Sequence, residues 1–88
     1  MSADDQLQKV RAIIKTRGDN YGSVADNWET TADLWNAVLR RKLKVELSAA
    51  DIGLLMIQLK VARLINSPDH DDSQLDVRGY AALLNEVV

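Results

Sequence analysis

The chain has 88 residues, of which 47% are hydrophobic and 27% charged, and its net charge is −2. This composition is that of a folded globular protein and excludes a disordered chain, and the lack of a basic excess makes a dedicated nucleic-acid-binding protein unlikely. The absence of cysteine excludes disulfides, thiolate zinc sites and a cysteine nucleophile.

The length predicts one domain over residues 1–88. A chain this short buries a limited core, which favours association into a homo-oligomer. No apolar run approaches the ~20 residues that a membrane-spanning helix needs, and the acidic N-terminus has no apolar core of an export signal. We therefore expect a cytoplasmic protein without a membrane segment.

Four serines are each followed three positions later by an aspartate, a pattern typical of helix starts. The serines are Ser2, Ser23, Ser48 and Ser73. Each hydroxyl can accept a hydrogen bond from a free N–H of the first turn, and the aspartate is favoured by the helix dipole. Together with the apolar periodicity, these signals predict an all-α, compact four-helix domain with helices at about 3–17, 24–41, 49–65 and 74–87.

The first two predicted helices are amphipathic. Gly18 is expected to end helix 3–17 in a left-handed conformation. In helix 24–41, Trp28 and Trp35 lie two turns apart on one face, a spacing that favours a role in the core.

The last two predicted helices differ in polarity. Helix 49–65 is apolar nearly all round, which indicates a central helix or part of a subunit interface. Pro68 keeps it from continuing, because the residue before proline is disfavoured in the helical region. In helix 74–87, Gly79 is expected to permit the close approach of a neighbouring backbone.

Lys60 and Arg63 are two cations on the otherwise apolar helix 49–65, so they need anionic partners. One interpretation is a structural ion-pair network with Asp51, Asp72 or Asp76. The other is that both cations bind a phosphate of a ligand.

The segment 69–72 surrounds His70, the single histidine, with aspartates. Oxygen-rich clusters suit Mg²⁺ or Ca²⁺, but the spacing matches neither an EF-hand nor a zinc site. We expect these acids to cap the last helix and to form ion pairs with Lys60 and Arg63, with no metal or cofactor. A serine-histidine-acid arrangement is equally unsupported.

Tyr21 lies in a glycine-flanked turn, where its ring can either attach the loop to the bundle or stack on a planar ligand such as a base. Asn27 and Trp28 follow it closely, and Tyr80 belongs to the last predicted helix. These side chains are candidates for a ligand site.

Three stretches together carry a resemblance to a known family. They are Tyr21-Gly22 with Asn27-Trp28 and Leu34-Trp35; Asp51 with Leu54-Leu55-Met56 and Leu59-Lys60-Val61-Ala62-Arg63; and Asp72-Ser73 with Asp76 and Gly79-Tyr80-Ala81-Ala82-Leu83. The sequence resembles a family of short phage and prophage proteins of unknown function. The resemblance covers roughly residues 18–87 and implies a viral or prophage origin without an activity.

The chain is also loosely similar to all-α nucleotide pyrophosphohydrolases of the MazG type, whose E-x-x-E and E-x-x-D pairs hold Mg²⁺ over a triphosphate. Asp26 and Glu29 form one comparable pair. Asp72 and Asp76 are the second candidate pair, but their spacing departs from the pattern.

From these observations we predict a non-enzymatic phage accessory protein, a helical homo-oligomer that binds a small anionic ligand such as a nucleotide, for example to sequester a host signal. The candidate ligand-binding residues are Tyr21, Asn27, Trp28, Lys60, Arg63, His70, Asp72, Asp76 and Tyr80. The alternatives are a Mg²⁺-dependent nucleotide pyrophosphohydrolase and a module that binds a host protein through helix 49–65.

Overall fold

The computed structural model describes residues 2–21 and 23–88, with the side chains of all of these except residues 20 and 21. The elements are α1 (Ala3–Tyr21), α2 (Val24–Leu39), α3 (Ala49–Asn66), α4 (Asp71–Leu83) and the short 3₁₀ helix η1 (Leu84–Glu86). The predicted all-α four-helix domain is confirmed.

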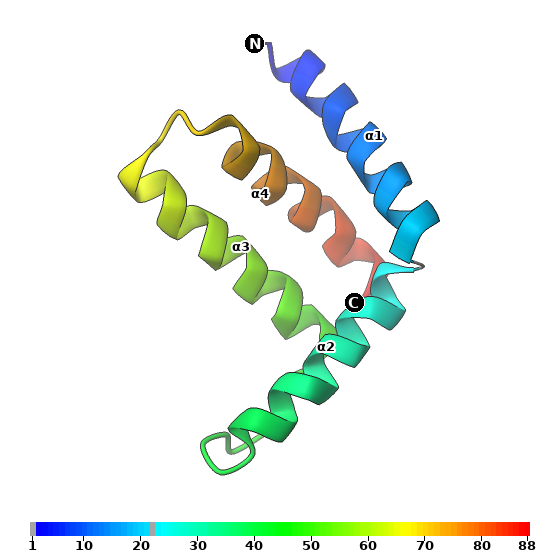
Figure 1. Ribbon diagram of the computed structural model, residues 1–88, viewed down its shortest axis with the longest axis vertical. Coiled ribbons are helices and arrows are strands. Elements are labelled where there is room, and N and C mark those ends of the chain that lie inside the picture. Colours follow the sequence, from blue (N-terminus) through cyan, green and yellow to red (C-terminus); the bar gives the residue numbers. More distant parts are fainter. Residues whose placement is uncertain (1, 22) are drawn as a thin grey trace.

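Helix α4 is the shared neighbour of α1 and α3, whereas α2 packs mainly on α3 (Figure 1). The C-terminal end of the chain lies near the beginning of α2, so η1 closes the space where α2, α3 and α4 converge. None of the described helices is long and apolar enough to cross a bilayer.

Three of the four predicted helix starts are confirmed by their caps. The hydroxyls of Ser2 and Ser23 each accept a hydrogen bond from the N–H three residues on, at 3.1 Å. At Ser48 the same bond measures 3.2 Å, and the Asp51 carboxylate accepts in return from the Ser48 N–H at 2.9 Å. This reciprocal pair is a complete capping box.

The fourth predicted start is wrong by one turn, because His70 and not Ser73 caps α4. The Nδ1 atom of His70 accepts from the Ser73 N–H at 3.3 Å and lies 2.8 Å from the Ser73 hydroxyl. Ser73 is itself buried, so its hydroxyl faces the interior. Asp71 and Asp72 then occupy the first turn, where the helix dipole favours them.

Two predicted helix ends are also corrected. Helix α1 continues through Gly18 to Tyr21, because Gly18 keeps a negative φ and glycine within a helix costs only about 1 kcal/mol. Helix α2 ends at Leu39 and not at residue 41. The N–H groups of Lys42 and Leu43 both bond to the Leu39 carbonyl, at 2.7 and 3.1 Å, and so close a turn there.

The main core cluster joins α2 to α3 through Trp28, Ala32 and Ile52, which are at most 7% exposed. Trp35 and Tyr80 are partly buried and pack against this cluster. The prediction that the two tryptophans belong to the core is therefore confirmed.

The glycine that permits a close approach is Gly53, not Gly79. A Cβ atom added at Gly53 would lie 2.8 Å from Cη2 of Trp28 and 2.9 Å from Cδ2 of Leu84. At Gly79 the same test meets nothing within 4 Å. The expectation for Gly79 is wrong, because α4 presents this position to open space.

The connection between α2 and α3 is fixed by Asn36. Its amide nitrogen donates to the Leu47 carbonyl at 3.0 Å, and its amide oxygen accepts from the Leu47 N–H at 2.8 Å. One side chain thereby satisfies both backbone groups of a residue outside any helix. This pair sets where α3 begins relative to α2.

Candidate functional site

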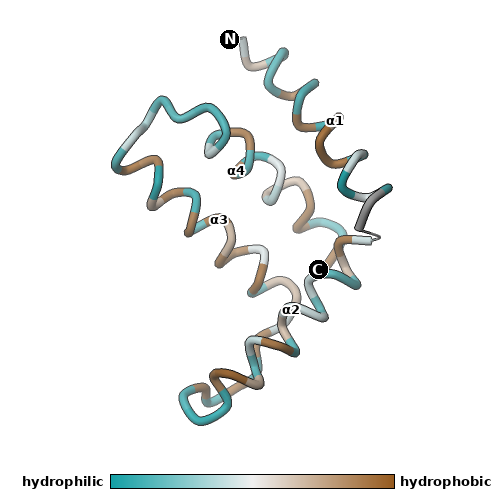
Figure 2. Tube along the Cα trace, in the orientation of Figure 1, coloured by the Kyte–Doolittle hydropathy of each residue, from teal (hydrophilic) through white to brown (hydrophobic). Residues whose placement is uncertain are grey.

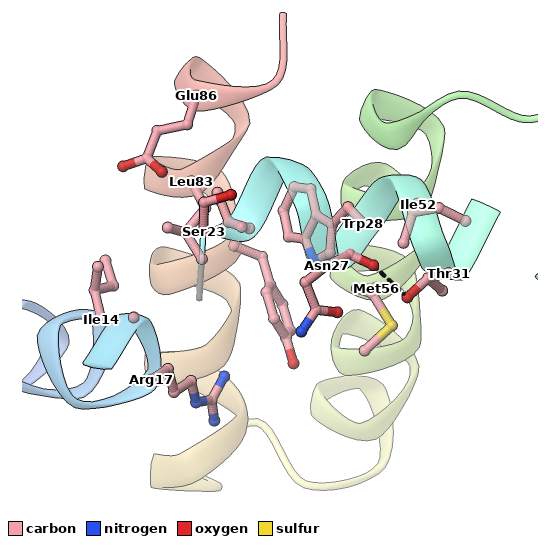
Figure 3. Close-up of a pocket in the computed structure, with 13 residues that line it drawn as sticks. Ile14, Arg17, Ser23, Asn27, Trp28, Thr31, Ile52, Met56, Leu83 and Glu86 are labelled. Atoms are coloured by element: carbon pink, nitrogen blue, oxygen red, sulfur yellow. Dashed lines mark hydrogen bonds between the residues drawn. The ribbon is translucent and has the colours of Figure 1, made fainter. Parts of the chain in front are cut away.

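A cavity of about 650 Å³ opens where the end of α1 meets α2, α3, α4 and η1 (Figure 3). This volume falls within the usual range of small-molecule sites, about 300–1,000 Å³. The described residues that line it are Ile14, Arg17, Gly18, Ser23, Val24, Asn27, Trp28, Thr31, Ile52, Met56, Tyr80, Leu83 and Glu86.

Two aromatic rings belong to the wall of this cavity. The ring centroids of Trp28 and Tyr80 lie 6.3 Å apart with an angle of 53° between their planes, a tilted arrangement favoured by aromatic quadrupoles. Trp28 also belongs to the core, so its position is set by packing and does not have to be organised by a ligand.

The polar groups of the cavity wall come from several elements, among them Arg17 of α1, Asn27 of α2 and Glu86 of η1. Arg17 of α1 and Asn27 of α2 extend their polar ends toward the same part of the cavity (Figure 3). Thr31 lies one turn further along α2, and its hydroxyl donates to the Asn27 carbonyl at 2.9 Å. A mostly apolar wall with a few convergent polar groups is the usual composition of a ligand site.

The Arg17 guanidinium is available to a ligand. Its side chain is 48% exposed, and Nη2 lies 3.8 Å from Oδ1 of Asp76, beyond hydrogen-bonding distance. In contrast, Nζ of Lys60 lies 3.0 Å from Oδ2 of Asp76, and both of these side chains are largely buried. Asp76 is therefore bound closely by Lys60 and only loosely by Arg17.

Lys60 and Arg63 do not share a site. Lys60 has the structural ion pair that was one of its two interpretations, with Asp76 as the partner. Arg63 is exposed and lines a separate surface depression of about 430 Å³ together with His70. The structure thus divides two residues that the sequence placed together: Lys60 pairs with Asp76 of α4, whereas Arg63 lies in the depression beside His70.

The remaining predicted site residues lie apart from the cavity or outside the described part. Asp72 is exposed in the first turn of α4, and the side chain of Tyr21 lies outside the described residues. Asp26 and Glu29 are exposed on α2. Within the described residues, no three histidine, cysteine, aspartate or glutamate side chains converge as metal ligands.

Of the predicted ligand-binding residues, the cavity brings together Asn27, Trp28 and Tyr80. Sequence reasoning missed Arg17 and Met56, which line the same cavity. A signal for Arg17 was present, since it follows Ile14 by three positions and so shares the face that α1 turns toward the bundle. It was passed over because α1 was expected to end there.

The fold and the cavity define a small all-α domain with a ligand-sized, aromatic-walled site. Residues 5–88 match the family described as a domain of unknown function, DUF6378, and the chain belongs to this family.

Two relatives come from mycobacteriophages, which confirms the expected phage family of unknown function. The chain is 37% identical to the Gene 55 protein of Mycobacterium phage L5 over 71 residues, which are 81% of this chain and 44% of that protein. It is 34% identical to the Gene 55 protein of Mycobacterium phage D29 over 77 residues, or 88% of this chain and 48% of that protein. The chain thus spans about half the length of these relatives, and no solved structure gives a significant match.

Proposed function

We propose that this domain is a non-enzymatic binding protein that holds a small anionic ligand, a nucleotide, in the cavity between α1 and α2. The observation that carries the proposal is one space bordered by both an aromatic pair, Trp28 and Tyr80, and a half-exposed guanidinium, Arg17. Aromatic rings bind the face of a planar base, while a guanidinium offers paired N–H donors to a phosphate.

The polar groups fit this assignment. The Arg17 donors are not satisfied by Asp76 at 3.8 Å, and Asn27 supplies an amide that can both donate and accept. Thr31 and Met56 complete a wall that is apolar over most of its extent. Sequestration of a host nucleotide signal is one use that such a site would serve in a phage protein.

The hydrolase alternative finds less support in this geometry. It needs Asp26, Glu29, Asp72 and Asp76 to converge on one Mg²⁺, but Asp26, Glu29 and Asp72 are exposed on two different helices. Asp76 is held by Lys60, which competes for the carboxylate. We therefore favour binding over Mg²⁺-dependent turnover.

Ligand-induced stabilisation of the full chain tests the proposal. A nucleotide at about 100 times its dissociation constant should add about 2.7 kcal/mol and raise the melting midpoint by roughly 10–20 °C. Arg17→Gln should weaken binding about tenfold or more, because a hydrogen bond to a charged group is lost. Arg11→Gln is the matched control, since Arg11 is exposed on the same helix outside the cavity.

A panel of linear and cyclic nucleotides that leaves the midpoint unchanged would overturn the proposal. So would an Arg17→Gln variant that binds as tightly as the Arg11→Gln control. Hydrolysis products that depend on Mg²⁺ and on Glu29 would instead establish the enzyme alternative.

The proposal includes self-association through the outer face of α3. The residues of this face are Leu54, Leu55, Gln58, Leu59, Ala62 and Ile65, all exposed. Leu55, Leu59 and Ala62 have the four-and-three spacing of helix–helix packing, and hydrophobic residues recur along all of α3 (Figure 2). None of the six carries a charge, and the exposed Arg63 borders them, since it lines one depression with Leu59 and Ala62. Two copies that pair across a two-fold axis can keep Arg63 at the solvated rim of the interface, so that no charge is buried.

Light scattering of the full chain across a range of concentrations measures its molecular mass and so tests self-association through α3. Leu59→Glu should shift the mass to that of one protomer, because the pairing would bury two carboxylates. Leu34→Glu, at an exposed leucine of α2, is the control and should leave the mass unchanged. A protein that stays a single protomer at every concentration contradicts self-association and redirects the search to a host protein.

A further inference from the structure

The cavity has two charged poles. Among the described residues that line it, Arg17 and Glu86 carry the formal charges. Figure 3 shows the guanidinium of Arg17 at one end of the cavity and the carboxylate of Glu86 at the other. The lining as a whole is therefore neutral, but its two ends differ in sign.

The positive pole amounts to one unit of charge. Lys60 is not among the lining residues and is paired with Asp76 at 3.0 Å, so their charges cancel. Arg17 is then the one cation of this three-residue cluster left without a close counter-ion. A single cation balances one phosphate group, and further phosphates would meet no second cation among the described lining residues, only the opposing field of Glu86.

The negative pole selects a hydrogen-bond donor. A carboxylate only accepts hydrogen bonds, and among nucleobases it pairs with an exocyclic amino group, as when glutamate or aspartate accepts from N4 of cytosine. A carbonyl in the same place, as in uracil, would face the carboxylate with a second acceptor. Both charged residues line the same cavity as the rings of Trp28 and Tyr80.

We infer that the ligand is a nucleoside monophosphate whose base carries an amino group, with its phosphate at Arg17 and its amino group at Glu86. This inference rests on the proposed nucleotide-binding function and narrows it to one class. Polyphosphates and bases with a carbonyl in place of the amino group bind more weakly.

Isothermal titration of the full chain with matched probes tests the inference. CMP and UMP differ in an amino group against a carbonyl, as do AMP and IMP. We expect the amino member of one pair to bind about threefold to tenfold more tightly, the effect of one hydrogen bond. The monophosphate should likewise bind more tightly than its triphosphate.

Glu86→Gln identifies the residue responsible. A glutamine amide both donates and accepts, so the preference for the amino member should fall to about onefold and the triphosphate should gain affinity. Glu46→Gln removes the same charge at an exposed position outside the cavity and should change neither ratio.

The outcomes distinguish failure of the two-pole inference from failure of the proposed binding function. If nucleotides bind in an Arg17-dependent way but without these preferences, or if Glu86→Gln leaves both ratios unchanged, the two-pole inference is wrong while the binding function stands. If none of the probes binds, the proposed function itself fails and the inference fails with it.

Discussion

The core between α2 and α3 and the cavity between α1 and α2 share the side chains of Trp28 and Ile52, but the two regions differ in packing density. Where α2 crosses α3, Trp28 and Ile52 are buried and Gly53 leaves no space for a methyl group. The same tryptophan also lines the cavity of about 650 Å³ between α1 and α2. A side chain held rigidly by the core can therefore also form part of the wall of an open cavity.

The cavity remains open because α1 buries few side chains against α2. Apart from Gln6 and Val10, the described side chains of α1 are partly or fully exposed, and α1 contacts mainly α4. Helix α2 therefore meets α3 without α1 filling the space beside it. The cavity exists because α1 packs mainly against α4 and makes few contacts with α2.

The most severe test of the comparison is Gly53→Ala. The added methyl group would overlap the ring of Trp28, so we expect a loss of about 3 kcal/mol in the free energy of unfolding. The same ring lines the cavity, so its displacement should weaken nucleotide binding as well. Chemical denaturation and titration measure the two effects; a variant with wild-type stability would show that the core is not tightly packed there.

Asn36→Ala should lower the stability of the domain without changing its affinity for a nucleotide. The change leaves the N–H and carbonyl of Leu47 without their side-chain partner, which should cost about 1–2 kcal/mol and lower the melting midpoint by roughly 5–15 °C. Asn36 does not line the cavity, so the affinity of the folded protein for a nucleotide should be unchanged. A large loss of affinity would mean that the α2–α3 connection also shapes the cavity.

Gly79→Ala should have the smallest effect on the free energy of unfolding and, unlike the two changes above, should raise it. No heavy atom lies within 4 Å of the new methyl group, and alanine favours a helix over glycine by up to about 1 kcal/mol. We expect a gain of about 0.5–1 kcal/mol, measured by the same denaturation experiment. A destabilised Gly79→Ala variant would contradict the open space assigned to this position.

Much of the fold was predictable because its signals are local. The caps at Ser2, Ser23 and Ser48 depend on residues three positions apart, and they were predicted correctly. The cap of α4 was not, since His70 is outside the usual cap residues and the burial of Ser73 is a tertiary feature. Local patterns therefore located the helices but not every terminus.

The candidate site was predicted only in part. Of the ligand-binding residues chosen from the sequence, Asn27, Trp28 and Tyr80 line one cavity, whereas Arg63 and His70 line a separate depression. Arg17 was missed because its role depends on where the end of α1 lies relative to α2. The spacing from Ile14 places Arg17 on the inward face of α1, but it does not show that this end of α1 lies beside α2.

The sequence by itself determined the number of helices, their apolar faces and the need of Lys60 for an anion, because these follow from spacing along a single helix and from the cost of burying a charge. Only the tertiary structure decided that Asp76 is that anion, that Gly53 is the point of closest approach, and that a cavity remains beside Trp28. Those features depend on how separate helices cross, and the crossing is set by packing among residues distant in the chain.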